Sequence, residues 1–317
     1  MVVAAAQVKK VGVIGAGTMG HGIAQAYAQE GYPVTITDVS KSALTGVKDR
    51  VKSNLETIAR EGLIPQSEIE KILARITVVD RLENAVRDAD IVTEAVFEDL
   101  PTKTKIFHEM DKACSPECVL ASNTSSFPMT QIASQMERPE RAIVTHWMNP
   151  PYLVPLVEVV PGEKTSEETY QTAYEILVKI KKVPVKVQKE ILGFLINRIQ
   201  TAMNREVYYL LEAGVASAED IDRAVVTSLG FRLAFLGPLL VRDLAGLDVD
   251  CKVADTILPE LDSSTQANRL LKDLVKRGDY GAKTGKGFFS YTPESIAEVI
   301  RERDRRFIHL LKELYYQ

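Results

Sequence analysis

The sequence predicts an α/β fold, with a doubly wound parallel sheet followed by a second, all-helical domain. Short apolar strands alternate with helical periods from residue 11 to residue 187, a pattern typical of a parallel sheet covered by helices on both faces. From Gly193 onward only helical periods occur. A chain of 317 residues suits two domains, and we expect them to span residues 1–190 and 191–317.

A glycine-rich turn joins the first strand, residues 11–14, to the first helix. Gly15 permits the tight turn, Gly17 lets the backbone approach a pyrophosphate, and Gly20 lets the helix pack closely on the strand, with its free N–H groups toward a phosphate. A second strand, residues 34–37, ends in Asp38, where a carboxylate accepts from an adenosine ribose and repels the extra phosphate of NADP. An ordinary glycine turn would not require a strand, a helix, a second strand and an acidic residue at this spacing, so the pattern predicts a Rossmann-type NAD site. Its expected contacts are Gly15, Ala16, Gly17, Thr18, Met19, Gly20 and Asp38.

The elements after Asp38 follow in a regular order. Residues 41–76 carry two helical patterns broken at residues 62–65, which predict a helix hairpin inserted into the sheet order. Further strands of the first domain are expected at residues 90–93, 119–123, 142–145, 156–160 and 183–187, and further helices at 82–87, 103–113 and 166–181. Helices of the second domain are expected at residues 193–212, 217–228, 238–245, 264–277 and 293–314. The apolar stripe on the first of these favours a homodimer.

Composition and charge argue against several classes of partner. The net charge of −4 and the isoelectric point near 5.8 do not suit a polyanion-binding surface, so we expect no nucleic-acid partner. The N-terminal apolar residues precede the first lysines, which is the reverse of a signal peptide, and are too few to span a bilayer. A cytoplasmic protein without a membrane partner is therefore expected. Cys114 and Cys118 have no second ligand pair at zinc spacing, so no metal is expected.

Polar residues follow the predicted strands at the edge where such sheets bind ligands. Residues 122–126 come after one strand, His146 after the next, Glu158 within the one after that, and Asn197 at the start of the long helix. Oxidation of a secondary alcohol needs a base for the hydroxyl proton, which suits the near-neutral pKa of histidine, and a carboxylate beside the ring would orient it. Of four histidines only His146 ends a strand. Position alone leaves open whether His146 is this base or a structural histidine.

Six motifs in this order resemble the L-3-hydroxyacyl-CoA dehydrogenase family over almost the whole chain. They are the glycine turn, SNTSS at 122–126, HWMNP at 146–150, LVEV at 156–159, GFLINR at 193–198 and KTGKGFFSY at 283–291. The resemblance implies an NAD-dependent enzyme that oxidises the 3-hydroxyl of a short-chain L-3-hydroxyacyl-CoA to the 3-oxoacyl-CoA, and the reverse, in fatty acid metabolism.

The resemblance also implies roles for individual residues. His146 would be the catalytic base and Glu158 its orienting carboxylate, which favours the base over the structural histidine. Ser125 and Asn197 would bind the substrate oxygen and polarise it. The remaining cofactor contacts implied by the motifs are Glu98, Lys103, Asn123, Asn149 and Lys283.

Three departures from the acyl-CoA enzymes concern the substrate. Glu56 and Glu61 stand in the hairpin where those enzymes usually carry lysines; carboxylates facing a nucleotide phosphate are unfavourable, although Lys52 and Arg60 could compensate. HWMNP replaces the usual HFFNP, and Leu192 replaces a proline. Residues 228–240, together with residues 149–166, resemble instead the branch that contains L-gulonate 3-dehydrogenase (lambda-crystallin), carnitine dehydrogenase and a dehydrogenase of a pyridine carboxylate.

Arg232 stands alone within that apolar run. A guanidinium there suits a bidentate contact with a free carboxylate of the substrate, and it equally suits an ion pair with a structural acid such as Asp243. We therefore expect an acyl-CoA substrate first and a free 3-hydroxy acid or related small carboxylate as the alternative. A non-catalytic crystallin-like or NAD-sensing protein is a third alternative, against which the intact set of Ser125, His146, Glu158 and Asn197 argues.

Overall fold

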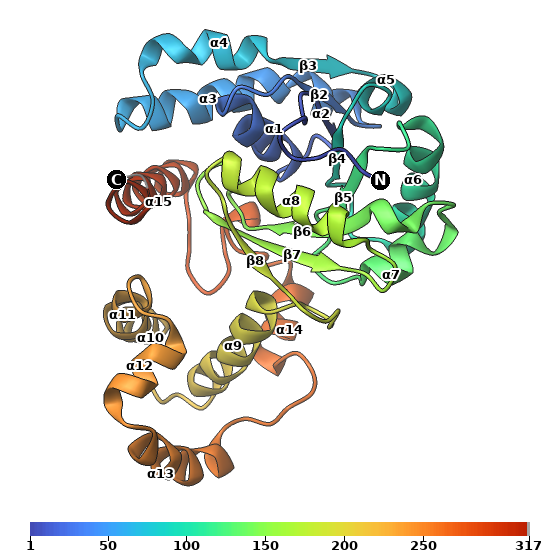
Figure 1. Ribbon diagram of the computed structural model, residues 1–317. Helices are drawn as coiled ribbons and strands as arrows, with labels where there is room; N and C mark the ends of the chain where they lie inside the picture. The colour runs from blue at the N-terminus through green and yellow to red at the C-terminus, as the bar shows by residue number, and fades with distance from the viewer. Residues whose placement is uncertain (316–317) are drawn as a thin grey trace. The chain divides into compact units, whose positions relative to one another are not determined.

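The computed structural model describes residues 1–315, and its first unit is built on one sheet (Figure 1). Within those residues the sheet has eight strands in the order β3-β2-β1-β4-β5-β6-β7-β8. They are β1 (Val11–Ile14), β2 (Val34–Thr37), β3 (Ile76–Val79), β4 (Ile91–Glu94), β5 (Val119–Ser122), β6 (Ala142–Trp147), β7 (Leu156–Pro161) and β8 (Val183–Lys186). The doubly wound sheet is confirmed. Its order reverses at β1, which lies between β2 and β4, and such a switch point is where α/β sheets bind ligands.

One strand pair departs from the predicted parallel arrangement. β6 and β7 are antiparallel, whereas the other neighbouring strands of this sheet run parallel. The reason lies in the connection, because residues 148–155 form a short loop without a helix, and a parallel return needs a longer crossover. The reversal places His146 of β6 directly opposite Glu158 of β7.

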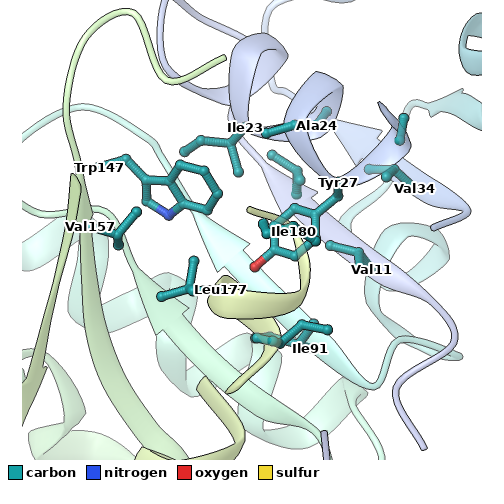
Figure 2. Packing of buried hydrophobic residues seen from close by; sticks show 14 of the residues in the cluster. Val11, Ile23, Ala24, Tyr27, Val34, Ile91, Trp147, Val157, Leu177 and Ile180 are labelled. Atoms are coloured by element: carbon teal, nitrogen blue, oxygen red, sulfur yellow. The ribbon is translucent and has the colours of Figure 1, made fainter. Parts of the chain in front are cut away.

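Helices cover both faces of the sheet, since successive side chains of a strand point to opposite faces. One face packs against α1 (Gly20–Gln29), α3 (Val47–Arg60), α4 (Ile69–Ala74) and α8 (Glu167–Lys179), and the other against α5 (Leu82–Val86), α6 (Leu100–Ala113) and α7 (Met129–Ile132). Figure 2 shows part of the first core, where Tyr27 of α1 and Trp147 of β6 lie close to Leu177 of α8. Trp147 directly follows His146, so this core fixes the end of the strand that carries the histidine.

The predicted helix hairpin is present as α3 and α4, preceded by the short α2 (Lys41–Thr45). The buried stripe of α3 consists of Val47, Val51, Leu55 and Ile58. The helix α15 (Pro293–Leu314) belongs to the same core through Ile308 and Leu311, and Lys312 donates to the backbone carbonyl of Glu61 at the end of α3. Residues 299–315 therefore belong to the first unit, which differs from the prediction that residues 191–317 form one helical domain.

The second unit, residues 198–298, is helical. It contains most of α9 (Ile196–Glu212), then α10 (Ala218–Val225), α11 (Phe231–Leu233), α12 (Pro238–Ala245), α13 (Leu247–Ile257) and α14 (Arg269–Arg277). The strand β3 and the helix α13 were not predicted. α13 follows α12 after a single residue, Gly246, whose φ of +98° breaks the helical path. α14 begins later than predicted because Asn268 caps it by accepting from the N–H of Leu270.

Large apolar side chains of the second unit are unusually exposed. Phe231, Leu239 and Leu244 are examples, each more than two thirds exposed. Among residues 1–315 no single helix is long and apolar enough to cross a membrane, and the bent pair Ala218–Leu233 and Pro238–Ala245 meets that length and composition test only when the two are joined.

Candidate active site

The glycine turn has the geometry that a pyrophosphate needs. Gly15 has a φ of +100°, and a Cβ there would lie 2.5 Å from the backbone oxygen of Ala95. A Cβ on Gly20 would lie 1.8 Å from the oxygen of Gly15, so the helix and the turn touch through their backbones. A Cβ on Gly17 would meet nothing within 4 Å. The start of α1 thus has open space beside Gly17 and no side chain capping its N–H groups, which fits a bound dinucleotide phosphate.

Asp38 lies at the end of β2, beside this turn. Its Oδ2 accepts from the N–H of Ala16 at 2.6 Å and its Oδ1 from the N–H of Ser40 at 2.7 Å. Arg50, which the sequence analysis did not single out, donates from Nη2 to the carbonyl of Ala16 at 2.9 Å and to that of Ala43 at 2.7 Å. Ala16 is therefore fixed at both of its backbone polar groups, with its N–H bound by the Asp38 carboxylate and its carbonyl by the Arg50 guanidinium.

His146 and Glu158 form a buried pair across β6 and β7. Nδ1 of His146 lies 2.7 Å from Oε2 of Glu158, and the exposed fractions of the two residues are 4% and 1%. Because a carboxylate only accepts, Nδ1 is the donor in this contact, and in the neutral ring Nε2 then carries the free lone pair. This is the tautomer that a general base requires.

The other oxygen of Glu158 binds backbone N–H groups at the start of α9. Oε1 accepts from Leu195 at 2.8 Å and from Ile196 at 3.0 Å. The chain reaches this position through Gly193 and Phe194, whose φ values are +78° and +49°. A left-handed conformation is costly for phenylalanine. Here the Phe194 side chain is buried, and the centroid of its ring lies 5.5 Å from that of the His146 ring. The positive φ values of Gly193 and Phe194 therefore direct the N–H groups of Leu195 and Ile196 toward Glu158, the carboxylate beside the histidine.

The loop after β5 joins the same cluster. Asn197 Nδ2 donates to the backbone carbonyl of Ser125 at 3.2 Å, and Asn123 Oδ1 accepts from the N–H of Trp147 at 2.9 Å. The first contact ties the start of α9 to the loop, and the second ties the loop to the residue after His146. The structure thus connects the four residues predicted for catalysis, Ser125, His146, Glu158 and Asn197, through short contacts within one unit.

Five further predicted site residues have different surroundings. Glu98 contacts the Ser125 loop, and Lys103 is fully buried beside it. Asn149 is exposed and precedes a cis peptide bond to Pro150. Arg232 and Lys283 lie exposed in the second unit. Arg232 donates to the carbonyl and the hydroxyl of Ser228, and no ion pair joins it to Asp243 in the described part of the chain.

The other three histidines contact backbone carbonyls or a partly exposed carboxylate. His21 Nδ1 lies 2.7 Å from the carbonyl of Gly17, and burial lowers its pKa. His108 contacts the carbonyl of Gln135, and His309 lies 3.5 Å from Glu61. No group of three or more His, Cys, Asp or Glu side chains within residues 1–315 could hold a metal ion. His146 is therefore the histidine of the described chain with a buried carboxylate partner.

Comparison with known proteins identifies the family. The model of the 3-hydroxyacyl-CoA dehydrogenase NAD binding domain matches residues 10–191, and that of the C-terminal domain matches residues 193–291. The chain belongs to the 3-hydroxyacyl-CoA dehydrogenase family. It is an NAD-dependent dehydrogenase that acts on a CH–OH group, as the motifs predict, and NAD is its cofactor.

Relatives in this family differ in their substrates. The chain is 39% identical to a probable 3-hydroxybutyryl-CoA dehydrogenase of Bacillus subtilis, over 90% of this chain and 98% of that one. It is 34% identical to an L-carnitine dehydrogenase of Streptomyces coelicolor, over 96% and 94%. It is 31% identical to a 5-formyl-3-hydroxy-2-methylpyridine 4-carboxylate 5-dehydrogenase of Mesorhizobium japonicum, over 95% and 96%. A crystal structure of an enzyme of the last name superposes with a TM-score of 0.89 at 30% identity, over 97% and 99%.

Proposed function

We propose that the enzyme oxidises the 3-hydroxyl of a short 3-hydroxyacyl compound with NAD⁺, and catalyses the reverse reduction, with His146 as the base. The observation that carries the proposal is the buried Glu158–His146 pair, which leaves Nε2 of the histidine free. A histidine that only filled space would not need a buried carboxyl partner held by two backbone N–H groups.

In the proposed reaction, Nε2 of His146 takes the proton of the substrate hydroxyl. Glu158 stabilises the imidazolium that forms and keeps the ring in place. Ser125 and the Asn197 amide hold the substrate oxygen, and such donors typically lower the barrier by about 3 kcal/mol each. The chemistry that NAD supplies when bound is acceptance of the hydride from the carbon that bears the hydroxyl. In the reverse reaction His146 returns its proton to the oxygen.

The acyl group has two candidates. The first is a CoA thioester, since several relatives are named 3-hydroxybutyryl-CoA dehydrogenases. The second is a free 3-hydroxy acid or related carboxylate, and a specific observation on the hairpin favours it. Lys52, a cation that could offset Glu56 and Glu61 near a nucleotide phosphate, is paired with Glu70 at 3.1 Å. The hairpin therefore offers less free positive charge than the sequence suggested.

Two measurements test this function. NADH oxidation with acetoacetyl-CoA, with acetoacetate and with hydroxylated 3-oxo acids, compared as kcat/KM, separates the two candidates. His146→Gln is expected to lose about 10³-fold in kcat while its NADH affinity stays unchanged. Normal turnover in that variant would refute the mechanism, and NADH binding without turnover of any 3-oxo substrate by the unmodified enzyme would support an NAD-sensing protein instead.

Three further predictions from the sequence belong to this proposal. The many exposed large apolar side chains of the second unit support a homodimer, because their burial in an interface would be favourable. A mass measurement in solution tests it. A place in fatty acid metabolism depends on the acyl-CoA candidate and is refuted if that candidate fails. The cytoplasmic location stays a prediction from the sequence, independent of the substrate.

A further inference from the structure

Three charged side chains form a row beside the loop that carries Ser125. Glu94 ends β4, Lys103 lies in the first turns of α6, and Glu98 lies between them in the chain. Lys103 Nζ is 2.8 Å from Glu94 Oε1 and 3.3 Å from Glu98 Oε2. The side chains of Lys103 and Glu94 are 1% and 0% exposed, while that of Glu98 is 37% exposed. The row runs from the interior of the unit to its surface.

The outer carboxylate holds the middle of the loop. Oε1 of Glu98 accepts from the hydroxyl of Thr124 at 2.6 Å and from the N–H groups of Ser125 at 2.9 Å and Ser126 at 3.0 Å. It also accepts from the hydroxyl of Ser126 at 2.8 Å. One oxygen thus fixes three successive residues, with Ser125 in the centre. The contacts use the backbone of Ser125 and leave its hydroxyl to a ligand.

The inner carboxylate holds the start of the same loop. Oε2 of Glu94 accepts from the hydroxyl of Ser122 at 2.6 Å, and that hydroxyl accepts from the N–H of Thr124 at 3.1 Å. The N–H of Asn123 donates to the backbone carbonyl of Glu94. Glu94 and Glu98 therefore bind the loop at two successive points, and the ammonium between them joins the two carboxylates.

Charge explains why a lysine lies there. A buried ammonium is costly unless it is paired, and two carboxylates this close would not both stay ionised without it. Burial alone would raise the pKa of Glu98, but hydrogen bonds from Thr124 and Ser126, and the charge of Lys103, hold it below its usual value. Lys103 also offsets a negative charge close to the place where the substrate oxygen gains negative charge in the proposed reaction.

We propose that Glu98 and Lys103 are positioning residues, which fix the Ser122–Phe127 loop so that the Ser125 hydroxyl meets the substrate oxygen, with Glu94 as their buried anchor. The proposal rests on the proposed function of Ser125. This role is separate from the direct cofactor contacts that the family resemblance implies for the same two residues, and hydrogen exchange of the loop without bound cofactor reports on it alone.

The test compares Lys103→Met and Glu98→Gln with the unmodified enzyme in three measurements: NADH affinity by fluorescence titration, kcat and KM for the preferred substrate, and hydrogen exchange of the amides of residues 124–126. We expect kcat at saturating NADH to fall about 10-fold to 100-fold, and those amides to exchange at least about tenfold faster without bound cofactor; the NADH titration sets the saturating concentration for each variant. Lys105→Met is the matched control, because Lys105 lies in the same helix with 76% of its side chain exposed.

A pH series sharpens the test. Removing the ammonium raises the pKa of Glu98, so protection of the Ser125 and Ser126 amides should be lost at a higher pH in Lys103→Met than in the unmodified enzyme as the pH falls. A residue that only filled space would not move this transition. If Lys103→Met does not fold, the double variant Glu94→Gln and Lys103→Met, which removes opposite charges together, takes its place.

Two results would overturn the proposal. One is a tenfold or larger loss of NADH affinity with unchanged exchange of the loop, which would assign both residues to the cofactor. The other is normal kcat and normal exchange in both variants. If the unmodified enzyme turns over no 3-oxo substrate, the proposed function fails, while the exchange and NADH measurements still decide whether the two residues hold the loop.

Discussion

Two carboxylates in this enzyme use their oxygens in the same way and serve different neighbours. Oε1 of Glu158 binds the N–H groups of Leu195 and Ile196, and its Oε2 binds His146. Oε1 of Glu98 binds the N–H groups of Ser125 and Ser126, and its Oε2 lies against Lys103. In each case backbone groups fix one oxygen, and this determines where the other oxygen can act.

The difference lies in the partner. Glu158 is almost fully buried beside a residue that gains and loses a proton in the proposed reaction. Glu98 is partly exposed, and its partner Lys103 is a buried side chain that takes no part in the proposed proton transfer. In the proposed roles, therefore, the same arrangement of a carboxylate shared between backbone N–H groups and a side chain supports proton transfer at Glu158 and loop geometry at Glu98.

The largest expected effect comes from Glu158→Gln. An amide can still meet the two backbone N–H groups through its oxygen, but its NH₂ group then faces Nδ1 and favours the wrong histidine tautomer. We expect kcat to fall about 10³-fold to 10⁴-fold, with NADH affinity unchanged. Steady-state kinetics and NADH titration check this.

Glu163→Gln is the control for that variant, since Glu163 follows the same strand and is exposed. If kcat fell less than tenfold in Glu158→Gln, Glu158 would have no role in orienting the base, and its proposed difference from Glu98 would be refuted.

Particular residues show what the sequence could reveal. The strand, glycine turn, helix and Asp38 follow from local patterns, because each depends on neighbours within about thirty residues. The pairing of His146 with Glu158 does not follow from spacing alone, since it depends on β6 and β7 being antiparallel. The family resemblance supplied that pairing.

Other features were beyond local patterns. The strand β3 has only four residues, Ile-Thr-Val-Val, and a single residue separates it from the end of α4, so its alternation is too short to recognise. Glu94 ends an apolar strand and Lys103 lies in an amphipathic helix, where lysine is usually exposed. Only the packing of α6 on the sheet reveals that their charges meet. The contact of α15 with the hairpin spans more than two hundred residues and has no local signal.

An intermediate effect is expected from Asp38→Ser. Both oxygens of Asp38 accept from backbone N–H groups, one from Ala16 and the other from Ser40. Serine removes the charge that repels the extra phosphate of NADP, so the ratio of kcat/KM for NAD⁺ over NADP⁺ should fall by about tenfold or more. Measured with both cofactors, an unchanged ratio would show that Asp38 serves the turn alone.

The smallest effect is expected from a change in the turn that precedes the two N–H donors of Glu158. Gly193 has a φ of +78°, and alanine there costs about 1–2 kcal/mol of folding free energy. Gly31→Ala is the matched control in the same unit, with a φ of +96° and no atom within 4 Å of the added Cβ. Both variants should lower the free energy of unfolding in urea by similar amounts.

Only Gly193→Ala should also lower kcat, by about 3-fold to 10-fold, because a shift of the turn moves the N–H groups of Leu195 and Ile196 away from Glu158 and loosens the histidine. Equal kcat values in the two glycine variants would mean that Glu158 keeps His146 in place without those N–H groups. The division of each carboxylate between backbone and side chain would then be a matter of packing at Glu158 and of function only at Glu98.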